Sequence, residues 1–235
     1  CGETFTLTEG KTKLTRHVSP MPFVPEGKED RDERCREILL LASLGLRRRL
    51  EHTGAKCAVV GLSGGLDSTL AVLITGLAMK MMDRPLSDII AVTMPCFGTT
   101  DRTRNNAVLL AEQMGAALRT VDISQSVRSH FRDIGHDPED HSVTYENAQA
   151  RERTQVLMDI ANEHGGLVIG TGDLSELALG WCTYNGDHMS MYGVNASIPK
   201  TLVRHLVGYL SRDGEEPELH DVLEDILDTP VSPEL

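Results

Sequence analysis

Residues 61–68 (GLSGGLDS) have the composition of a loop that binds phosphate groups. Their glycines let the backbone turn tightly and let a ligand approach the amides closely. A predicted strand precedes the segment and a predicted helix follows it, so the first amides of that helix and the positive end of its dipole would add to an anion site. The hydroxyl groups of two serines supply further donors. We predict that eight residues bind a polyphosphate: Gly61, Leu62, Ser63, Gly64, Gly65, Leu66, Asp67 and Ser68.

An acidic residue distinguishes this segment from a Walker A loop, which carries Gly-Lys-Ser/Thr after four variable residues. Asp67 would repel bare phosphate, so its carboxylate favours a Mg²⁺ ion that bridges to the phosphates. The alternative is a glycine-rich turn in which Asp67 and Ser68 only cap the helix. The complete Ser-Gly-Gly-x-Asp-Ser string after an apolar strand favours the phosphate site.

Alternating apolar strands and helices would position this loop. Short apolar runs predict strands at residues 57–62, 88–94, 117–122 and 166–170. Helical patterns cover residues 30–54, 67–82, 102–114, 124–131, 144–164, 201–210 and 218–227. This alternation predicts the α/β class, with a doubly wound parallel sheet and flanking helices. Residues 1–30, which hold Pro20, Pro22 and Pro25, are predicted to be an extension ahead of one domain over residues 31–235.

Composition excludes several classes of protein. The net charge is −12 and the 23 basic residues form no long run, which argues against nucleic-acid binding. Five cysteines without a C-x-x-C pair suggest reduced thiols and a cytoplasmic location. No apolar run reaches the roughly 18 residues that a membrane span needs, so no membrane partner is expected.

Residues 63–68 resemble the pyrophosphate loop of the ATP pyrophosphatase group, whose members transfer AMP to a substrate oxygen. Three further parts of the chain distinguish between the members of that group. They are residues 94–106, residues 145–153, and the neighbouring segments 170–176 and 180–187. These parts resemble NAD⁺ synthetases, and most closely the long, glutamine-dependent kind. The resemblance covers residues 20–235. It implies an adenine nucleotide alpha hydrolase-like fold. It also implies that residues 1–30 link to a missing amidase domain. Because the chain stops at Leu235 just after a proline-rich turn, we expect the synthetase domain in residues 31–235 to be truncated at its C-terminus.

The resemblance implies that ATP activates the carboxylate of deamido-NAD⁺ and that ammonia then displaces AMP to give NAD⁺. In the intact protein, the glutaminase (amidase) domain would supply the ammonia from glutamine. Asp67 and Glu176 would hold Mg²⁺, Thr171 and Lys200 would contact ATP, and Asp173 would either accept a proton from ammonium or cap a helix. The positions implied for deamido-NAD⁺ are Asn147, Arg151, Glu176, Trp181, Cys182, Thr183 and Tyr184.

Several of these assignments have ordinary structural alternatives. Glu176 could be a solvated charge near a helix start, Lys200 an ordinary first-turn lysine, and Trp181 a core residue. Residues 183–187 read TYNGD, where many short family members carry a lysine in Thr-Lys-Tyr-Gly-Asp, and this difference points to the long branch.

The resemblance also implies a homodimer or a higher homo-oligomer. Two rival functions remain. One is a tRNA-modifying enzyme with the same loop. The other is a non-catalytic or truncated fragment that binds nucleotides.

Overall fold

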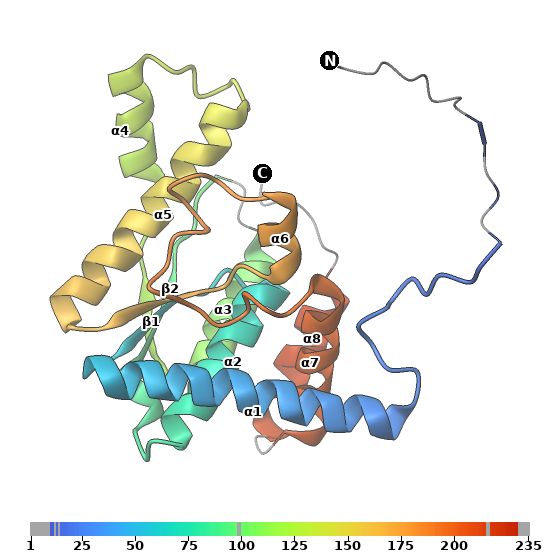
Figure 1. The fold of residues 1–235 in the computed structure, drawn as a ribbon. Helices are drawn as coiled ribbons and strands as arrows, with labels where there is room; N and C mark the ends of the chain where they lie inside the picture. The colour runs from blue at the N-terminus through green and yellow to red at the C-terminus, as the bar shows by residue number, and fades with distance from the viewer. Residues whose placement is uncertain (1–9, 12, 14, 98–99, 215–216, 230–235) are drawn as a thin grey trace, which may run out of the picture.

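Parallel strands form the centre of the structure (Figure 1). This computed structural model describes residues 10–11, 13, 15–97, 100–214 and 217–229. Within them, the sheet has the strand order β3-β2-β1-β4-β5, and every neighbouring pair is parallel. The strands are β1 (Ala58–Gly61), β2 (Ile89–Thr93), β3 (Ala117–Thr120), β4 (Leu167–Gly170) and β5 (Tyr192–Gly193). The order reverses between β1 and β4, and ligands of open α/β sheets bind outside the strand ends at such a point.

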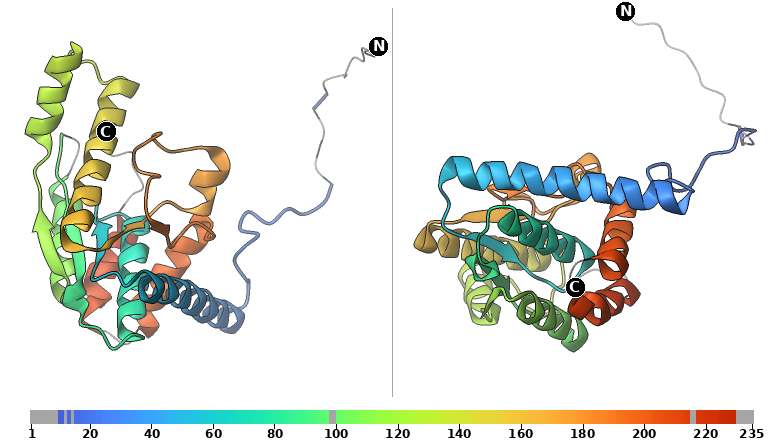
Figure 2. Two further views of the ribbon diagram at one scale, coloured as in Figure 1. Left: turned by 60° about the vertical axis from the view of Figure 1, so that its left-hand side comes forward. Right: turned by 90° about the horizontal axis from the view of Figure 1, so that it is seen from below.

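Helices cover both faces of the sheet, and Figure 2 shows α5 on the opposite side from α1. Side chains of β1 alternate between two apolar clusters, with Ala58 and Val60 in one and Val59 in the other. The first cluster joins the sheet to α1 (Lys28–Thr53), α2 (Leu66–Lys80), α3 (Asp101–Met114), α7 (Lys200–Asp213) and α8 (His220–Asp228). The second joins it to α4 (Ser124–Ile134) and α5 (Val143–His164). The predicted doubly wound α/β fold is confirmed.

The elements predicted from the sequence are present, and their ends differ from the prediction by at most three residues. Sequence reasoning missed the short helix α6 (Leu174–Leu179), strand β5, and the 3₁₀ turns η1 (Leu86–Asp88) and η2 (Pro217–Leu219). Of the predicted extension, residues 1–9 lie outside the described part, and the described residues before Lys28 form no helix or strand. None of the helices described here has the length and apolarity needed to cross a membrane.

An ion pair holds α8 against the first turn of α3. Arg102 donates to both carboxylate oxygens of Asp225, with an Nε–Oδ2 distance of 3.0 Å and an Nη2–Oδ1 distance of 2.6 Å. The Asn106 amide donates a third bond of 2.7 Å to the same carboxylate. The hydrogen bonds from Arg102 and Asn106 lower the pKa of Asp225 below its ordinary value.

We expect Asp225→Asn to lower the melting temperature slightly at neutral pH, because solvent-exposed ion pairs contribute little. A carboxylate with a lower pKa in the folded chain stabilises it above the unfolded pKa of about 3.9. That contribution is lost as the pH falls through the folded pKa. Thermal unfolding of both proteins between about pH 7 and about pH 2 should therefore show the difference shrinking in acid. A difference that is the same at every pH would rule out the carboxylate charge as its source.

Candidate active site

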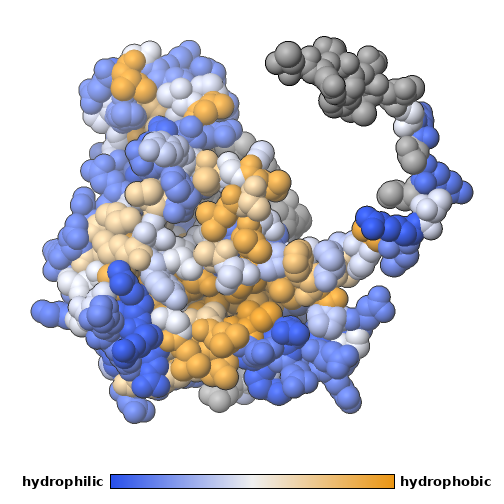
Figure 3. Space-filling view, in the orientation of Figure 1, coloured by the Kyte–Doolittle hydropathy of each residue, from blue (hydrophilic) through white to orange (hydrophobic). Residues whose placement is uncertain are grey.

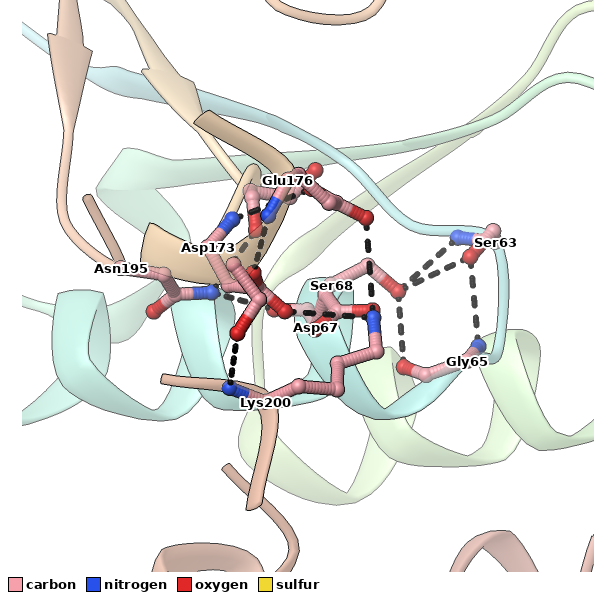
Figure 4. A network of polar contacts seen from close by, with 10 residues as sticks. Ser63, Gly65, Asp67, Ser68, Asp173, Glu176, Asn195 and Lys200 are labelled. Carbon is pink, nitrogen blue, oxygen red and sulfur yellow. Dashed lines mark hydrogen bonds and ion pairs between the residues drawn. The ribbon is translucent and has the colours of Figure 1, made fainter. Parts of the chain in front are cut away.

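The phosphate loop, residues 61–68, leaves the carboxyl end of β1 and enters α2 (Figure 4). Hydroxyl groups hold its shape, because Ser68 Oγ donates to the Gly65 carbonyl at 3.0 Å and lies 3.1 Å from Ser63 Oγ. Ser63 Oγ also accepts a hydrogen bond of 3.2 Å from the Gly65 amide. Gly65 stands at the N-cap of α2 and has no side chain to cap it. The first amides of α2 are therefore available to an anion.

Gly64 brings this loop into close contact with α3. Its φ is +85°, in the left-handed region that glycine adopts at little cost. A Cβ at this position would lie 2.1 Å from the carbonyl oxygen of Thr103. Thr103 belongs to the first turn of α3, where its amide donates to the N-cap side chain of Thr100. The loop therefore rests directly on the α3 backbone.

Three carboxyl groups surround the ammonium of Lys200 beside the phosphate loop (Figure 4). Lys200 Nζ lies 2.5 Å from Asp67 Oδ2, 3.3 Å from Asp173 Oδ2 and 3.6 Å from Glu176 Oε1. Asp67 belongs to the first turn of α2, Asp173 and Glu176 to the start of α6, and Lys200 to the start of α7. The fold thus brings together all four predicted catalytic residues from three separate segments.

Asp173 has a second contact that fixes α6. Its Oδ1 accepts a hydrogen bond of 2.9 Å from the Glu176 amide, and Glu176 Oε2 accepts one of 3.1 Å from the Asp173 amide. This reciprocal pair is a capping box. The prediction that Asp173 could cap the following helix is confirmed. Its other oxygen, which is fully buried, faces Lys200.

The charges in this cluster shift one another's pKa values. Burial raises the pKa of Glu176, while the hydrogen bond from the Asp173 amide and the Lys200 charge oppose that rise. Burial acts to lower the pKa of Lys200, but the hydrogen bond to Asp67 and the surrounding carboxylates outweigh it, so this pKa is raised. Lys200 therefore stays a cation and neutralises part of the negative charge.

The oxygen donors of the cluster fit a magnesium ion. Asp67 Oδ1 is buried and accepts no hydrogen bond from the described residues. Glu176 provides a second carboxylate beside the Lys200 ammonium (Figure 4). Within the described part of the chain, no three His, Cys, Asp or Glu side chains are arranged so that they could hold a metal ion by themselves. Mg²⁺ is commonly held by one or two carboxylates together with phosphate oxygens and water, so Asp67 and Glu176 suit it alongside a bound polyphosphate.

A second group of predicted residues lies where the loop after α6 meets α5 (Figure 1). Thr183 Oγ1 donates to Asn147 Oδ1 at 2.7 Å, and Arg151 Nε donates to the Tyr184 carbonyl at 3.1 Å. The Trp181 amide donates to the Glu176 carbonyl at 2.9 Å. These bonds connect the predicted deamido-NAD⁺ positions to the helix that carries Glu176.

Several side chains of this second group are exposed. Trp181 is 79% exposed and Tyr184 75%, and Cys182 is exposed as well. The alternative that Trp181 packs in the core is therefore wrong. Three leucines of α6, Leu174, Leu177 and Leu179, are also exposed, and they belong to the apolar patch that Figure 3 shows over α6. Rings and apolar side chains at this site are free to contact a ligand or a second subunit.

Sequence reasoning missed one residue at the centre of the polar network. Asn195 lies in the loop between β5 and α7 and is fully buried (Figure 4). It contacts the backbone of Thr171, the half-buried residue directly after β4 that was predicted to contact ATP. No pattern in residues 194–199 (VNASIP) signals this role, because it depends on which carbonyls the fold brings beside the side chain.

Comparison with known proteins agrees with this geometry. The family model for NAD synthase matches residues 40–233. The glutamine-dependent NAD(+) synthetase of Mycobacterium tuberculosis (strain H37Rv) is 44% identical over 232 residues, which cover 96% of this chain and 34% of that protein. The chain thus spans about a third of the length of the curated relatives it matches first.

Solved structures show the same likeness. The glutamine-dependent NAD⁺ synthetase of Acinetobacter baumannii in complex with ADP has a TM-score of 0.75 and 30% identity, covering 85% of this chain and 36% of that one. The NMN synthetase of Francisella tularensis has a TM-score of 0.71 and 26% identity, covering 85% and 76%. Since the family model covers well over half of the residues and the sheet carries its phosphate loop at the expected strand end, this chain belongs to the NAD synthase family.

Proposed function

We propose that this chain is the synthetase part of an NAD⁺ synthetase, a ligase that uses ATP to adenylate deamido-NAD⁺ and ammonia to amidate it. The observation that carries the proposal is the polar cluster at the point where the strand order of the sheet reverses. There Asp67 of the phosphate loop lies beside Lys200, and the carboxyl groups of Asp173 and Glu176 contact the same lysine. Such a site can bind a triphosphate and neutralise the negative charge that develops on the leaving phosphate oxygens during the reaction. The ADP complex of the A. baumannii relative supports an adenine nucleotide as the ligand.

The phosphate loop would hold the β- and γ-phosphates of ATP through its amides and the hydroxyl groups of Ser63 and Ser68. A carboxylate oxygen of deamido-NAD⁺ then bonds to the α-phosphorus, and the bond from that phosphorus to the leaving pyrophosphate breaks. The Lys200 side chain would leave Asp67 and contact the pyrophosphate oxygens instead. Its positive charge would then lie where negative charge develops. Asp67 and Glu176 would hold Mg²⁺, which when bound neutralises phosphate charge.

Ammonia completes the reaction by attacking the acyl carbon of the adenylate. The carbon–nitrogen bond forms, the bond to AMP oxygen breaks, and the nitrogen loses a proton. Asp173 Oδ2 is buried beside Lys200 and is our candidate for accepting that proton. The chain would need no covalent nucleophile, because ATP supplies the activation.

Residues at the contact of α5 with the loop after α6 would bind deamido-NAD⁺. The amide of Asn147 and the guanidinium of Arg151 suit its phosphates and its nicotinate group. Cys182, Thr183 and Tyr184 would line the same site. Trp181 offers an exposed ring that can stack on the pyridine ring.

We expect Trp181→Ala to raise the KM for deamido-NAD⁺ by about three- to tenfold, because that is the range in which aromatic stacking contributes. The KM for ATP should stay unchanged, since the phosphate loop lies elsewhere. Trp181→Phe, which keeps a ring, is the matched control and should resemble the wild type. Steady-state kinetics with each substrate varied in turn decide the point. Equal effects on both KM values would contradict the assignment.

The remaining parts of the whole enzyme are proposals of the same kind. An amidase domain outside this chain would release ammonia from glutamine, as the names of the long relatives suggest. A homodimer or higher homo-oligomer would cover the exposed leucines of α6. The free thiols of Cys35, Cys57 and Cys182 suit the cytoplasm.

The proposed function is tested by giving the full-length protein ATP, Mg²⁺, deamido-NAD⁺ and ammonium. AMP, pyrophosphate and NAD⁺ should form in equal amounts, and none should form without deamido-NAD⁺. A tRNA-modifying enzyme would instead form AMP only when tRNA is present. A non-catalytic fragment would bind ATP–Mg²⁺ in calorimetry and form no AMP at all.

A further inference from the structure

A buried amide connects the two strand ends between which the proposed reaction takes place. Asn195 has no exposed surface, and its Nδ2 lies 2.9 Å from the Asp67 carbonyl oxygen and 2.9 Å from the Thr171 carbonyl oxygen. The Asp67 carbonyl belongs to the first turn of α2, at the point where the phosphate loop enters that helix. The Thr171 carbonyl follows β4 directly. One side chain therefore bridges segments that leave β1 and β4, the two strands at which the order of the sheet reverses.

The chemistry of the two contacts fixes how this side chain is oriented. Both partners are carbonyl oxygens, which only accept hydrogen bonds, and an amide NH₂ group has two hydrogens to donate. If the amide were turned over, its oxygen would face two other oxygens, and the buried site would lose both bonds. Asn195 Oδ1 accepts no hydrogen bond from the described residues, so donation through Nδ2 is how the side chain is held.

The same loop also carries groups of the proposed site. The Asn195 carbonyl accepts a bond of 2.8 Å from the Ile198 amide, and the Ile198 carbonyl accepts one of 3.0 Å from the Leu174 amide at the start of α6. Lys200 follows two residues later, and its amide donates to Ser175 Oγ at 3.1 Å. The loop from Asn195 to Lys200 therefore touches every segment that contributes a carboxylate.

We propose that Asn195 is a positioning residue, which sets the distance between the phosphate loop and the β4 end and so aligns Asp67 with Asp173, Glu176 and Lys200. The inference rests on the proposed function, because it concerns the alignment of that same site. Asn195 itself touches neither substrate in this account. Its effect should fall on the chemical step, where small errors in the relative position of groups are costly, and much less on the binding of ATP, which the phosphate loop holds with its own amides.

The test compares Asn195→Ala, Asn195→Asp and Asn195→Ser in the full-length protein, with ammonia as nitrogen donor. We expect Asn195→Ala to lower kcat for NAD⁺ formation by about 100-fold, while the Kd for ATP–Mg²⁺ in calorimetry changes by less than about threefold. Asn195→Asp keeps the size of the side chain but cannot donate a hydrogen bond when ionised, so its kcat should be no higher than that of Asn195→Ala. Asn195→Ser keeps one hydroxyl donor and should recover part of the rate.

Ser211→Ala serves as the control for loss of a buried hydrogen-bonded group. Ser211 is 7% exposed, and its Oγ donates to Glu224 Oε1 at 2.6 Å on the far part of α7. Its replacement should lower the melting temperature and leave kcat unchanged. A kcat for Asn195→Ala equal to that of the wild type, or an equal loss in Ser211→Ala, would overturn the inference. If Asn195→Ala does not fold, the kcat of Asn195→Ser decides by the same criterion. An inactive wild type would refute the proposed function instead.

Discussion

Replacing Asp67 by asparagine should lower the turnover of NAD⁺ formation by about 1,000-fold, the upper range for loss of one preorganised electrostatic group. The substitution keeps the shape of the side chain and removes its charge. Asp67 makes the shortest contact with Lys200, at 2.5 Å, and its other oxygen is the buried donor suited to Mg²⁺. The change would therefore weaken the metal site and release Lys200 from the position that the cluster gives it.

The measurement is kcat for AMP release with saturating ATP, deamido-NAD⁺ and ammonium. The affinity for Mn²⁺ in the presence of ATP, followed by the paramagnetic resonance of the free ion, provides a second measurement that does not depend on turnover. It should fall in Asp67→Asn. Asp133→Asn, an exposed acid on α4, is the matched control and should leave both unchanged. Full turnover in Asp67→Asn would show that the carboxylate has no role in the reaction, and unchanged Mn²⁺ affinity would remove Asp67 from the metal site.

The sequence predicted those parts of the site that depend on local pattern. Residues 58–61 form a short run that is buried on both faces of the sheet, so their apolar composition identified β1. The glycine and serine spacing of residues 61–68 then identified the loop, because its hydrogen bonds are formed within that segment. Asp173 and Glu176 stand three apart, which is also the spacing of the capping box that begins α6. Attention to that spacing would have predicted the helix.

Other features depend on contacts between distant segments, and no local pattern reveals them. Strand β5 has two residues, too few for an alternating pattern, and exists because Tyr192 and Gly193 pair with Ile169 and Gly170 of β4. The bonds of Asn195 span 128 and 24 residues of sequence. The salt bridge between Lys200 and Asp67 spans 133 residues, so the resemblance to a family indicated Lys200 while its carboxylate partners came from the fold. The order of the strands in the sheet determines these contacts, and that order cannot be read from the spacing of residues along the chain.

Adding one methyl group at Gly64 should disable the phosphate loop. Two costs combine at this position. An L-residue in the left-handed region costs roughly 1–2 kcal/mol, and forcing a side chain into filled space typically costs another 1–3 kcal/mol. The new Cβ in Gly64→Ala would lie 2.1 Å from the Thr103 carbonyl oxygen and 2.9 Å from its carbon. Both are backbone atoms in the first turn of α3, so no side-chain rotation can relieve the overlap, and the loop must move away from α3.

Gly115→Ala separates the two costs. Gly115 ends α3 with a φ of +72°, but a Cβ there would meet nothing within 4 Å. The free energy of unfolding of Gly115→Ala, measured in urea, should fall only by the roughly 1–2 kcal/mol that an L-residue costs in the left-handed region. Its kinetic constants should equal those of the wild type. Gly64→Ala should lose more stability, roughly 2–5 kcal/mol, and its kcat/KM for ATP should fall by about 100-fold because the loop amides no longer meet the phosphates. Equal kinetics in the two variants would mean that the contact with Thr103 does not hold the loop in its binding shape. A selective loss in Gly64→Ala would show that the contact of the loop with the first turn of α3 contributes to nucleotide binding.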